Sequence, residues 1–288
     1  MSVVIKYDAI VIGGGDIVQP WGIDPRYFSK DFLAKPVFVV GVGVPIRKGL
    51  PADSHYVEKD WIVKKYQAFF NHPNLKMVHA RDPQSSDWIK SRLDPEVGMI
   101  DGPDIVCALT LPAAQKPDGA PILGIVTRQR PGQDDDYSQI NALAQQQIEK
   151  GWRIRHIILG SVEVGERDLL DAVGVKGMKE TVYSQNLYDL DIAIGECTAL
   201  VSMKFHGSVA ATMYGVPSTV LIPTNKNRNF MRRIGRDDLL SHFEDETLCE
   251  RFSNGPPAPI QAEKVELLRN NARQTMFHLE QTLSEAIT

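Results

Sequence analysis

The chain has 288 residues, 43% of them hydrophobic, and a net charge of -4, values typical of a globular protein with two ordinary domains or one large one. The negative balance argues against general nucleic-acid binding, and no run reaches the roughly 18 apolar residues of a membrane span. The N-terminus lacks the pattern of a secretory signal. Three separated cysteines form neither a disulfide framework nor a metal pattern. We therefore expect a cytoplasmic protein without a metal site.

The first part of the chain alternates strands with helices. Each of the first two predicted strands is followed by glycines, Gly13-Gly14-Gly15-Asp16 and then Gly41-Val42-Gly43. Successive strands of this kind predict parallel pairing, with the strand ends lining a cleft. The predicted strands are residues 7–12, 37–40, 75–80 and 97–100, and the predicted helices are residues 54–71, with Ser54 as the cap, and 83–93.

A second alternation follows a proline-rich loop at residues 111–121, which we interpret as a domain boundary. It predicts strands at 122–127, 154–159, 181–183, 200–203 and 218–222, and helices at 136–150, 163–173 and 187–197. The pattern indicates an α/β fold of two Rossmann-like, doubly wound domains. They would span residues 1–116 and 117–288, and a final amphipathic helix at 261–286 would belong to the second.

The most informative stretch is residues 200–222, which predicts a strand, a sharp turn, a helix and a second strand. Lys204 and His206 leave the carboxyl end of the first strand, where open α/β sheets place ligands. The N–H groups of Gly207 and Ser208 would open the helix, whose N-terminus attracts anions. These groups favour a phosphate or carboxylate site with a proton donor beside it. A packed turn, whose histidine hydrogen-bonds a neighbouring carbonyl, is the alternative, and the spacing alone favours this packed turn slightly.

Other candidate site residues lie at strand ends and in loops. Arg128 follows a predicted strand and could hold an anion bidentately, although a solvated arginine is equally compatible with this position. Gly14, Gly15 and Asp16 could line a cleft, but the dinucleotide fingerprint is incomplete, because it needs glycine where Val18 stands. Nicotinamide cofactor binding is therefore disfavoured.

Two further segments carry candidate acceptor residues. The loop at residues 19–28 contains Trp21, which could stack on a sugar or pack as a lid over the core. The segment NKNRNFMRRIGR at 225–236 contains Lys226 and is locally basic. It could meet a lipid-linked acceptor at a membrane surface, or it could be an ordinary solvated helix face.

Together these motifs resemble the polysaccharide pyruvyl transferase family over nearly the whole chain. The carrying stretches are DAIVIGGGDIV, VFVVGVGVP, VHARDPQSSDWI, PDIVCAL, ILGIVTR and, most specifically, VSMKFHGSVAATMYGVPSTVLI followed by NKN.

The resemblance implies a glycosyltransferase-B-like fold and transfer of pyruvate from phosphoenolpyruvate to two sugar hydroxyls as a ketal, without another cofactor. By resemblance, His206 is the general acid or base. Arg128, Lys204, Gly207 and Ser208 would bind the donor, with no metal. The acceptor would be a cell-surface glycan or a lipid-linked precursor at the inner face of the membrane. The oligomeric state stays open.

The chain departs from the family pattern in two places. Lys204 stands where the family often has arginine, which keeps the charge and loses the bidentate fork. The chain also opens without the initial strand and glycine-containing turn that the family usually has, so we expect a shortened N-terminal domain. A nucleotide-sugar glycosyltransferase on the same fold and a non-catalytic remnant of the family are therefore the alternative hypotheses.

Overall fold

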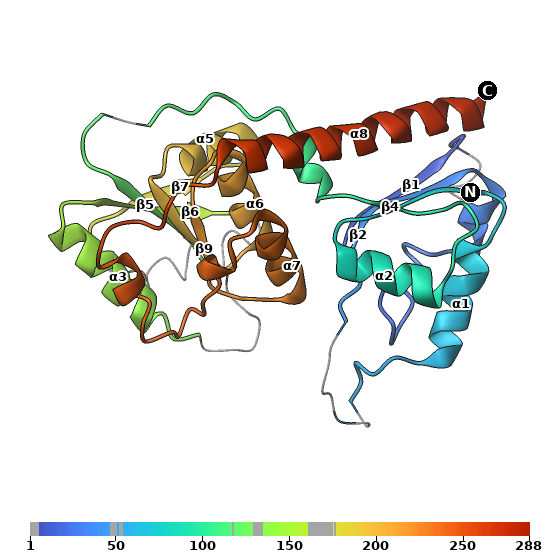
Figure 1. Ribbon diagram of the computed structural model, residues 1–288, viewed down its shortest axis with the longest axis horizontal. Coiled ribbons are helices and arrows are strands. Elements are labelled where there is room, and N and C mark those ends of the chain that lie inside the picture. Colours follow the sequence, from blue (N-terminus) through green and yellow to red (C-terminus); the bar gives the residue numbers. More distant parts are fainter. Residues whose placement is uncertain are drawn as a thin grey trace. The chain divides into compact units, whose positions relative to one another are not determined.

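The computed structural model describes residues 6–46, 51, 54–116, 118–128, 135–160, 175 and 177–288 (Figure 1). The chain divides into two compact units, residues 1–108 with 268–288, and residues 109–267. The helix expected at 163–173 lies outside the described residues. Among the helices that the structure describes, none combines the length and the apolar character that a membrane span requires.

The first unit contains a four-stranded parallel sheet in the order β1-β2-β3-β4. Its strands are β1 (Ile10–Gly15), β2 (Val37–Val42), β3 (Leu75–Ala80) and β4 (Ile100–Asp101). The strand order follows the sequence and never reverses, whereas a doubly wound sheet reverses at a switch point. In the described residues the first sheet is therefore parallel, as expected, but differs from the doubly wound arrangement that we predicted for it.

Both faces of this sheet are covered. Helices α1 (Asp60–Phe70) and α2 (Pro83–Arg92) contribute to one core, where Tyr66 and Ile89 are fully buried. On the other face, Leu279 of α8 (Ala262–Ile287) packs in one cluster with Phe38 and Met77. Alternation of side chains along the buried strand β2 supplies both cores. The end of α8 thus completes the first unit, although the sequence led us to assign this helix to the second.

Three predicted boundaries in the first unit shift. The glycine run expected as a turn continues β1, because Gly13 and Gly15 pair with Val40 and Val42 of β2. Helix α1 begins at Asp60 with Lys59 as its N-cap, so Ser54 does not cap it. The Lys59 N–H instead donates to the Pro20 carbonyl at 3.0 Å, which fixes the preceding segment to the 19–22 loop. The last strand is reduced to two residues, β4.

The second unit contains a five-stranded parallel sheet in the order β7-β6-β5-β8-β9. The strands are β5 (Ile122–Val126), β6 (Arg153–Ile158), β7 (Glu180–Tyr183), β8 (Ala199–Ser202) and β9 (Ser218–Val220). Numbered from β5, this is the 3-2-1-4-5 order of Rossmann-type sheets. The direction of winding reverses between β5 and β8, and ligands in such sheets bind at the carboxyl ends of the two strands that flank this reversal.

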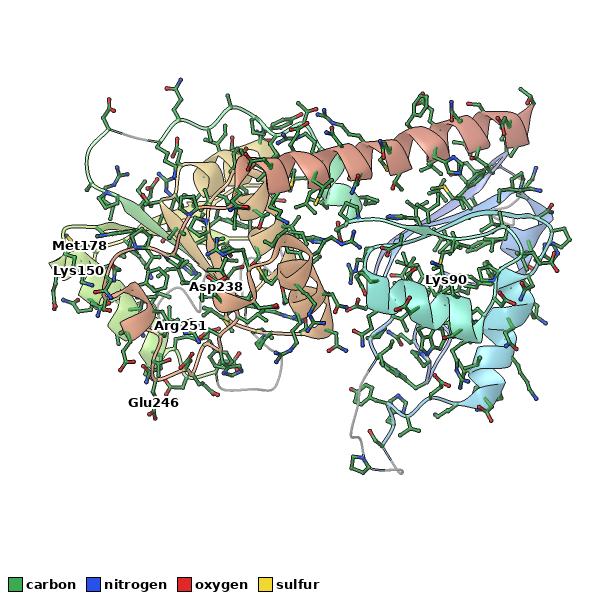
Figure 2. All side chains as sticks on the ribbon, in the orientation of Figure 1. Lys90, Lys150, Met178, Asp238, Glu246 and Arg251 are labelled. Atoms are coloured by element: carbon green, nitrogen blue, oxygen red, sulfur yellow. The ribbon has the colours of Figure 1, made fainter. Side chains whose placement is uncertain are left out.

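Helices and short 3-10 turns cover this sheet. The cluster on one face includes Leu143 of α3 (Ser138–Glu149). The cluster on the other includes Leu190 of α5 (Leu187–Gly195) and Ala211 of α6 (Phe205–Met213). The remaining helical elements of this unit are α7 (Asn225–Ile234), η4 (Asp237–Leu239) and η5 (Glu250–Phe252), whereas η2 (Lys30–Ala34) and η3 (Ile105–Ala108) belong to the first unit. Arg251 of η5 donates from Nη1 to the Asp238 carbonyl of η4 at 3.1 Å (Figure 2).

We predict that Gly124→Ala destabilises the second unit. A Cβ at this position in β5 would lie 2.7 Å from Cys197 Sγ and closer still to Leu200 Cδ1. Overpacking a dense core costs roughly 1–3 kcal/mol, measurable as a lower free energy of unfolding in urea. Gly22→Ala is the control, because a Cβ there meets nothing within 4 Å. Equal stability of the two variants would contradict the packing argument.

Candidate functional site

The two strands at the reversal point carry candidate residues at matching positions. Strands β5 and β8 pair in register, with Val126 opposite Ser202. Arg128 and Lys204 each lie two residues beyond this pair, so the backbone positions leave the same edge of the sheet. Arg128 is exposed and Lys204 is half-buried. The structure therefore brings these two predicted anion-binding residues to neighbouring strand ends.

A short hydrogen-bond network fixes the turn between β8 and α6. Ser202 Oγ accepts from the Lys204 N–H at 3.1 Å and donates to the Lys204 carbonyl at 2.8 Å. The Met203 N–H donates to the Val126 carbonyl at 2.8 Å, which ties the turn to β5. His206 lies in the first turn of α6 and is exposed. Its imidazole is thus held at the sheet edge and accessible to a substrate.

The side chain of Lys204 makes a hydrogen bond within the protein. Its ammonium group donates to the Leu159 carbonyl, which follows β6. This bond positions the positive charge near the sheet edge.

The structure adds Lys226 to this group from a distant part of the sequence. Lys226 lies in the first turn of α7, and its Nζ is 5.3 Å from the centre of the Phe205 ring. The His206 ring contacts the same phenyl ring, with a centroid distance of 5.2 Å. The Phe205 ring, at the N-terminal and electropositive end of α6, therefore contacts both the histidine and the lysine.

Gly207 has a packing role, and Ser208 acts differently from the sequence-based expectation. A Cβ on Gly207 would lie 2.7 Å from Ser202 Oγ, so the glycine permits close packing of α6 on β8. The Ser208 N–H donates to the Lys204 carbonyl at 3.4 Å, and the Ser208 hydroxyl accepts from Ser218 Oγ at 3.0 Å. Ser208 is 1% exposed. Its expected role as a free N–H donor to the ligand is therefore wrong in this structure.

The sequence analysis did not identify a buried hydrogen-bonded pair that includes Thr127, the residue before Arg128. Thr127 Oγ1 and His156 Nε2 are 2.8 Å apart, and both side chains are buried. Burial, and to a lesser degree the positive charges of Lys179 and Lys204, lower the pKa of His156 to about 4. The imidazole is therefore neutral near pH 7. A histidine within the predicted strand at 154–159 was the available sequence signal.

In the first unit, Asp16 lies directly after β1 in an ion-pair network. Arg81, which follows β3, pairs with Asp16 and with Asp104, the latter at 3.4 Å. The Arg81 side chain is 3% exposed, whereas that of Asp16 is 33% exposed. A Cβ on Gly43 would lie 2.6 Å from Asp16 Oδ1, so glycine makes room for the carboxylate. Arg81 and Asp104 are residues that the sequence reasoning missed.

The remaining candidates of the first unit divide into two groups. Gly14 and Gly15 have φ values of 61° and 97°, a backbone region that favours glycine. They form the end of β1 directly before Asp16. Trp21 is 8% exposed and packs edge-on against Tyr56 with ring centroids 5.2 Å apart. Trp21 therefore packs within the protein, the second of the two alternatives for this loop, and does not offer a stacking face. The described residues contain no His, Cys, Asp and Glu cluster that could hold a metal ion.

The parallel sheets and the reversal point between β5 and β8 define a Rossmann-type α/β protein with cationic side chains at the strand ends. A family model for polysaccharide pyruvyl transferase matches residues 2–225. The chain belongs to this family and is a transferase of polysaccharide biosynthesis. No curated protein sequence matches the chain.

Similar solved structures agree on the fold. The UDP complex of MnaA from S. aureus has a TM-score of 0.62 at 11% identity, covering 98% of this chain and 76% of that one. The accessory secretory protein 1, 2 and 3 structure of Streptococcus pneumoniae has a TM-score of 0.50 at 10% identity, covering 90% of this chain and 52% of that one. These neighbours have glycosyltransferase-B-like folds, and at such identities the likeness concerns the fold alone.

We predict that His156 makes stability depend on pH. Its pKa is about 4 in the folded state and 6.5 in the unfolded state. The contribution of His156 to the free energy of unfolding is therefore complete above pH 6.5. This contribution is lost as the pH falls toward 4, because the unfolded state binds more protons. The loss amounts to about 3 kcal/mol. Urea titrations would measure the free energy of unfolding at pH 4.5 and at pH 7.5. The difference between the two values should be smaller for His156→Gln than for the parent, and an equal difference in both proteins would contradict the prediction.

Proposed function

We propose that the protein transfers pyruvate from phosphoenolpyruvate to two hydroxyls of a sugar in a cell-surface glycan or its precursor. The membership of the family supports the reaction class. The observation that carries the proposal is the grouping of His206 and Lys226 around Phe205, beside Lys204 and one strand from Arg128. Such a site suits a ligand with a phosphate, a carboxylate and a carbon atom to be protonated.

In this mechanism the cations hold the donor while a proton is moved. Arg128 can contact one anionic group through two N–H bonds. Lys204 and Lys226 offer point charges to the other. His206 protonates C3 of phosphoenolpyruvate, and a sugar hydroxyl attacks the electron-poor C2 and gives up its proton. The proton of the first hydroxyl returns to His206, the bond between C2 and the phosphate oxygen breaks, and the second hydroxyl closes the ring, so that its proton leaves with the phosphate as HPO₄²⁻.

We assign Asp16 to the acceptor side of the proposed reaction. Its carboxylate is oriented by Arg81 and remains one-third exposed, so it can accept a hydrogen bond from a sugar hydroxyl. Gly14 and Gly15 keep this edge of the first sheet free of side chains. Trp21 is not proposed as a ligand contact, because it is buried.

We expect His206→Ala to reduce acceptor-dependent phosphate release from phosphoenolpyruvate by roughly 10²–10⁴-fold, the range contributed by a general acid. Phosphate release and mass spectrometry of the sugar product would measure this. His242→Ala is the matched control, because His242 is a half-exposed histidine of the same unit that contacts Phe243. Undiminished turnover by His206→Ala would reject its assigned role. Donor binding without turnover by the parent would favour a non-catalytic remnant.

The proposed donor-binding role of Lys204 can be tested with one substitution that keeps the positive charge and one that removes it. We expect Lys204→Arg to retain activity, because the family often has arginine here and the positive charge is kept. Lys204→Ala should raise KM for phosphoenolpyruvate by roughly tenfold or more, because a charged hydrogen bond contributes about 1.5–3 kcal/mol. Steady-state kinetics would measure both. An alanine variant with the parental KM would show that the ammonium group serves only the turn.

A nucleotide-sugar glycosyltransferase is the second candidate, favoured by the UDP in the S. aureus structure. The segment from His206 to Arg236 contains no aspartate or glutamate, so it supplies no carboxylate for a ribose. Incubation with UDP-sugars separates the candidates, because this activity would release a nucleoside diphosphate instead of inorganic phosphate.

A further inference from the structure

The first unit contains a cavity of about 870 Å³ between η2, the preceding loop and α1. The cavity does not include the proposed reaction residues. Its apolar lining comes from Ile23, Phe28, Leu33 and Phe69. Cavities of 300–1,000 Å³ with mainly apolar linings are typical of sites for small molecules or chain segments. The apolar surface can therefore accept a hydrocarbon chain.

The polar lining of this cavity is basic. Lys30, Lys64, Lys65 and His72 line it, and no aspartate or glutamate does. Asp31 and Asp60 occur next to these segments in the sequence but are not lining residues. Because the whole chain has a net charge of -4, this local excess of cations is not a consequence of composition. The charge is complementary to an anionic head group attached to an apolar chain.

An exposed aromatic residue accompanies the basic lining. Trp61 is 55% exposed, and Lys65 Nζ lies 4.8 Å from the centre of its ring. The two residues are one helical turn apart on α1, so Trp61 stands beside a residue that lines the cavity. Tyr27 of the preceding loop is 39% exposed. Tryptophan and tyrosine favour the interface between membrane and water, and lysines there are attracted to anionic lipids.

We propose that this face of the first unit binds an anionic phospholipid in a membrane surface. One acyl chain would enter the cavity against Phe28 and Phe69, while Lys30, Lys64 and Lys65 contact the phosphate. Trp61 would lie at the head-group level. This combines apolar burial with electrostatic attraction, the two contributions that stable peripheral binding requires. The proposal does not depend on the pyruvyl transfer reaction.

The test is sedimentation of the full chain with vesicles of phosphatidylcholine alone or with added phosphatidylglycerol. We expect binding to the anionic vesicles only. Changing Lys30, Lys64 and Lys65 together to glutamine should lower the partition coefficient about 100-fold, since each lysine contributes about fivefold. The control changes Lys6, Lys76 and Lys90, three residues of the first unit that do not line the cavity. Equal losses in both triple variants would overturn the proposal.

A second measurement tests the cavity itself. Ala68 lines the cavity from α1, and Ala68→Trp should fill part of it and lower vesicle binding at least tenfold while circular dichroism stays unchanged. Brominated acyl chains should quench tryptophan fluorescence in the parent and less in Trp61→Phe. Unchanged binding by a folded Ala68→Trp variant would overturn chain insertion. Complete displacement from the vesicles by millimolar glycerol phosphate would show a soluble phosphate site instead.

Discussion

The hydrogen-bonded pairing of β5 with β8 is the constraint on which the candidate site depends. It joins two strands that are far apart in the sequence and reverses the winding of the sheet between them. Because the register sets Val126 opposite Ser202, Arg128 and Lys204 emerge at the same edge. No local preference of either segment could produce this arrangement, since it requires the sheet.

The turn after β8 then converts this edge into a chemical site. Ser202 fixes the backbone of Lys204 on both sides of the residue, and Gly207 lets α6 pack tightly against the strand. These packing roles hold His206 at an exposed position. Ser202 and Gly207 therefore help to position the residues whose side chains can reach a ligand.

The two units use carboxyl strand ends differently. In the second unit the exposed groups are cations, whereas in the first Arg81 is buried and the half-exposed group is the Asp16 carboxylate. A cationic edge suits a donor with two anionic groups, and a carboxylate suits the hydroxyls of a sugar. This difference in charge gives the proposed donor and acceptor assignments their physical basis.

The sequence by itself determined the alternation of strands and helices, the parallel α/β class, the family, and the emergence of Lys204 and His206 at a strand end, because these depend on local periodicity and motifs. Only the tertiary structure brought Lys226 to Phe205, paired Arg81 with Asp16, buried Trp21 and packed the end of α8 on the first sheet. Those outcomes depend on contacts between residues distant in sequence, where burial and hydrogen-bond partners are set by the whole fold. The same side chain can therefore be a ligand contact or a core residue without any change in its local sequence.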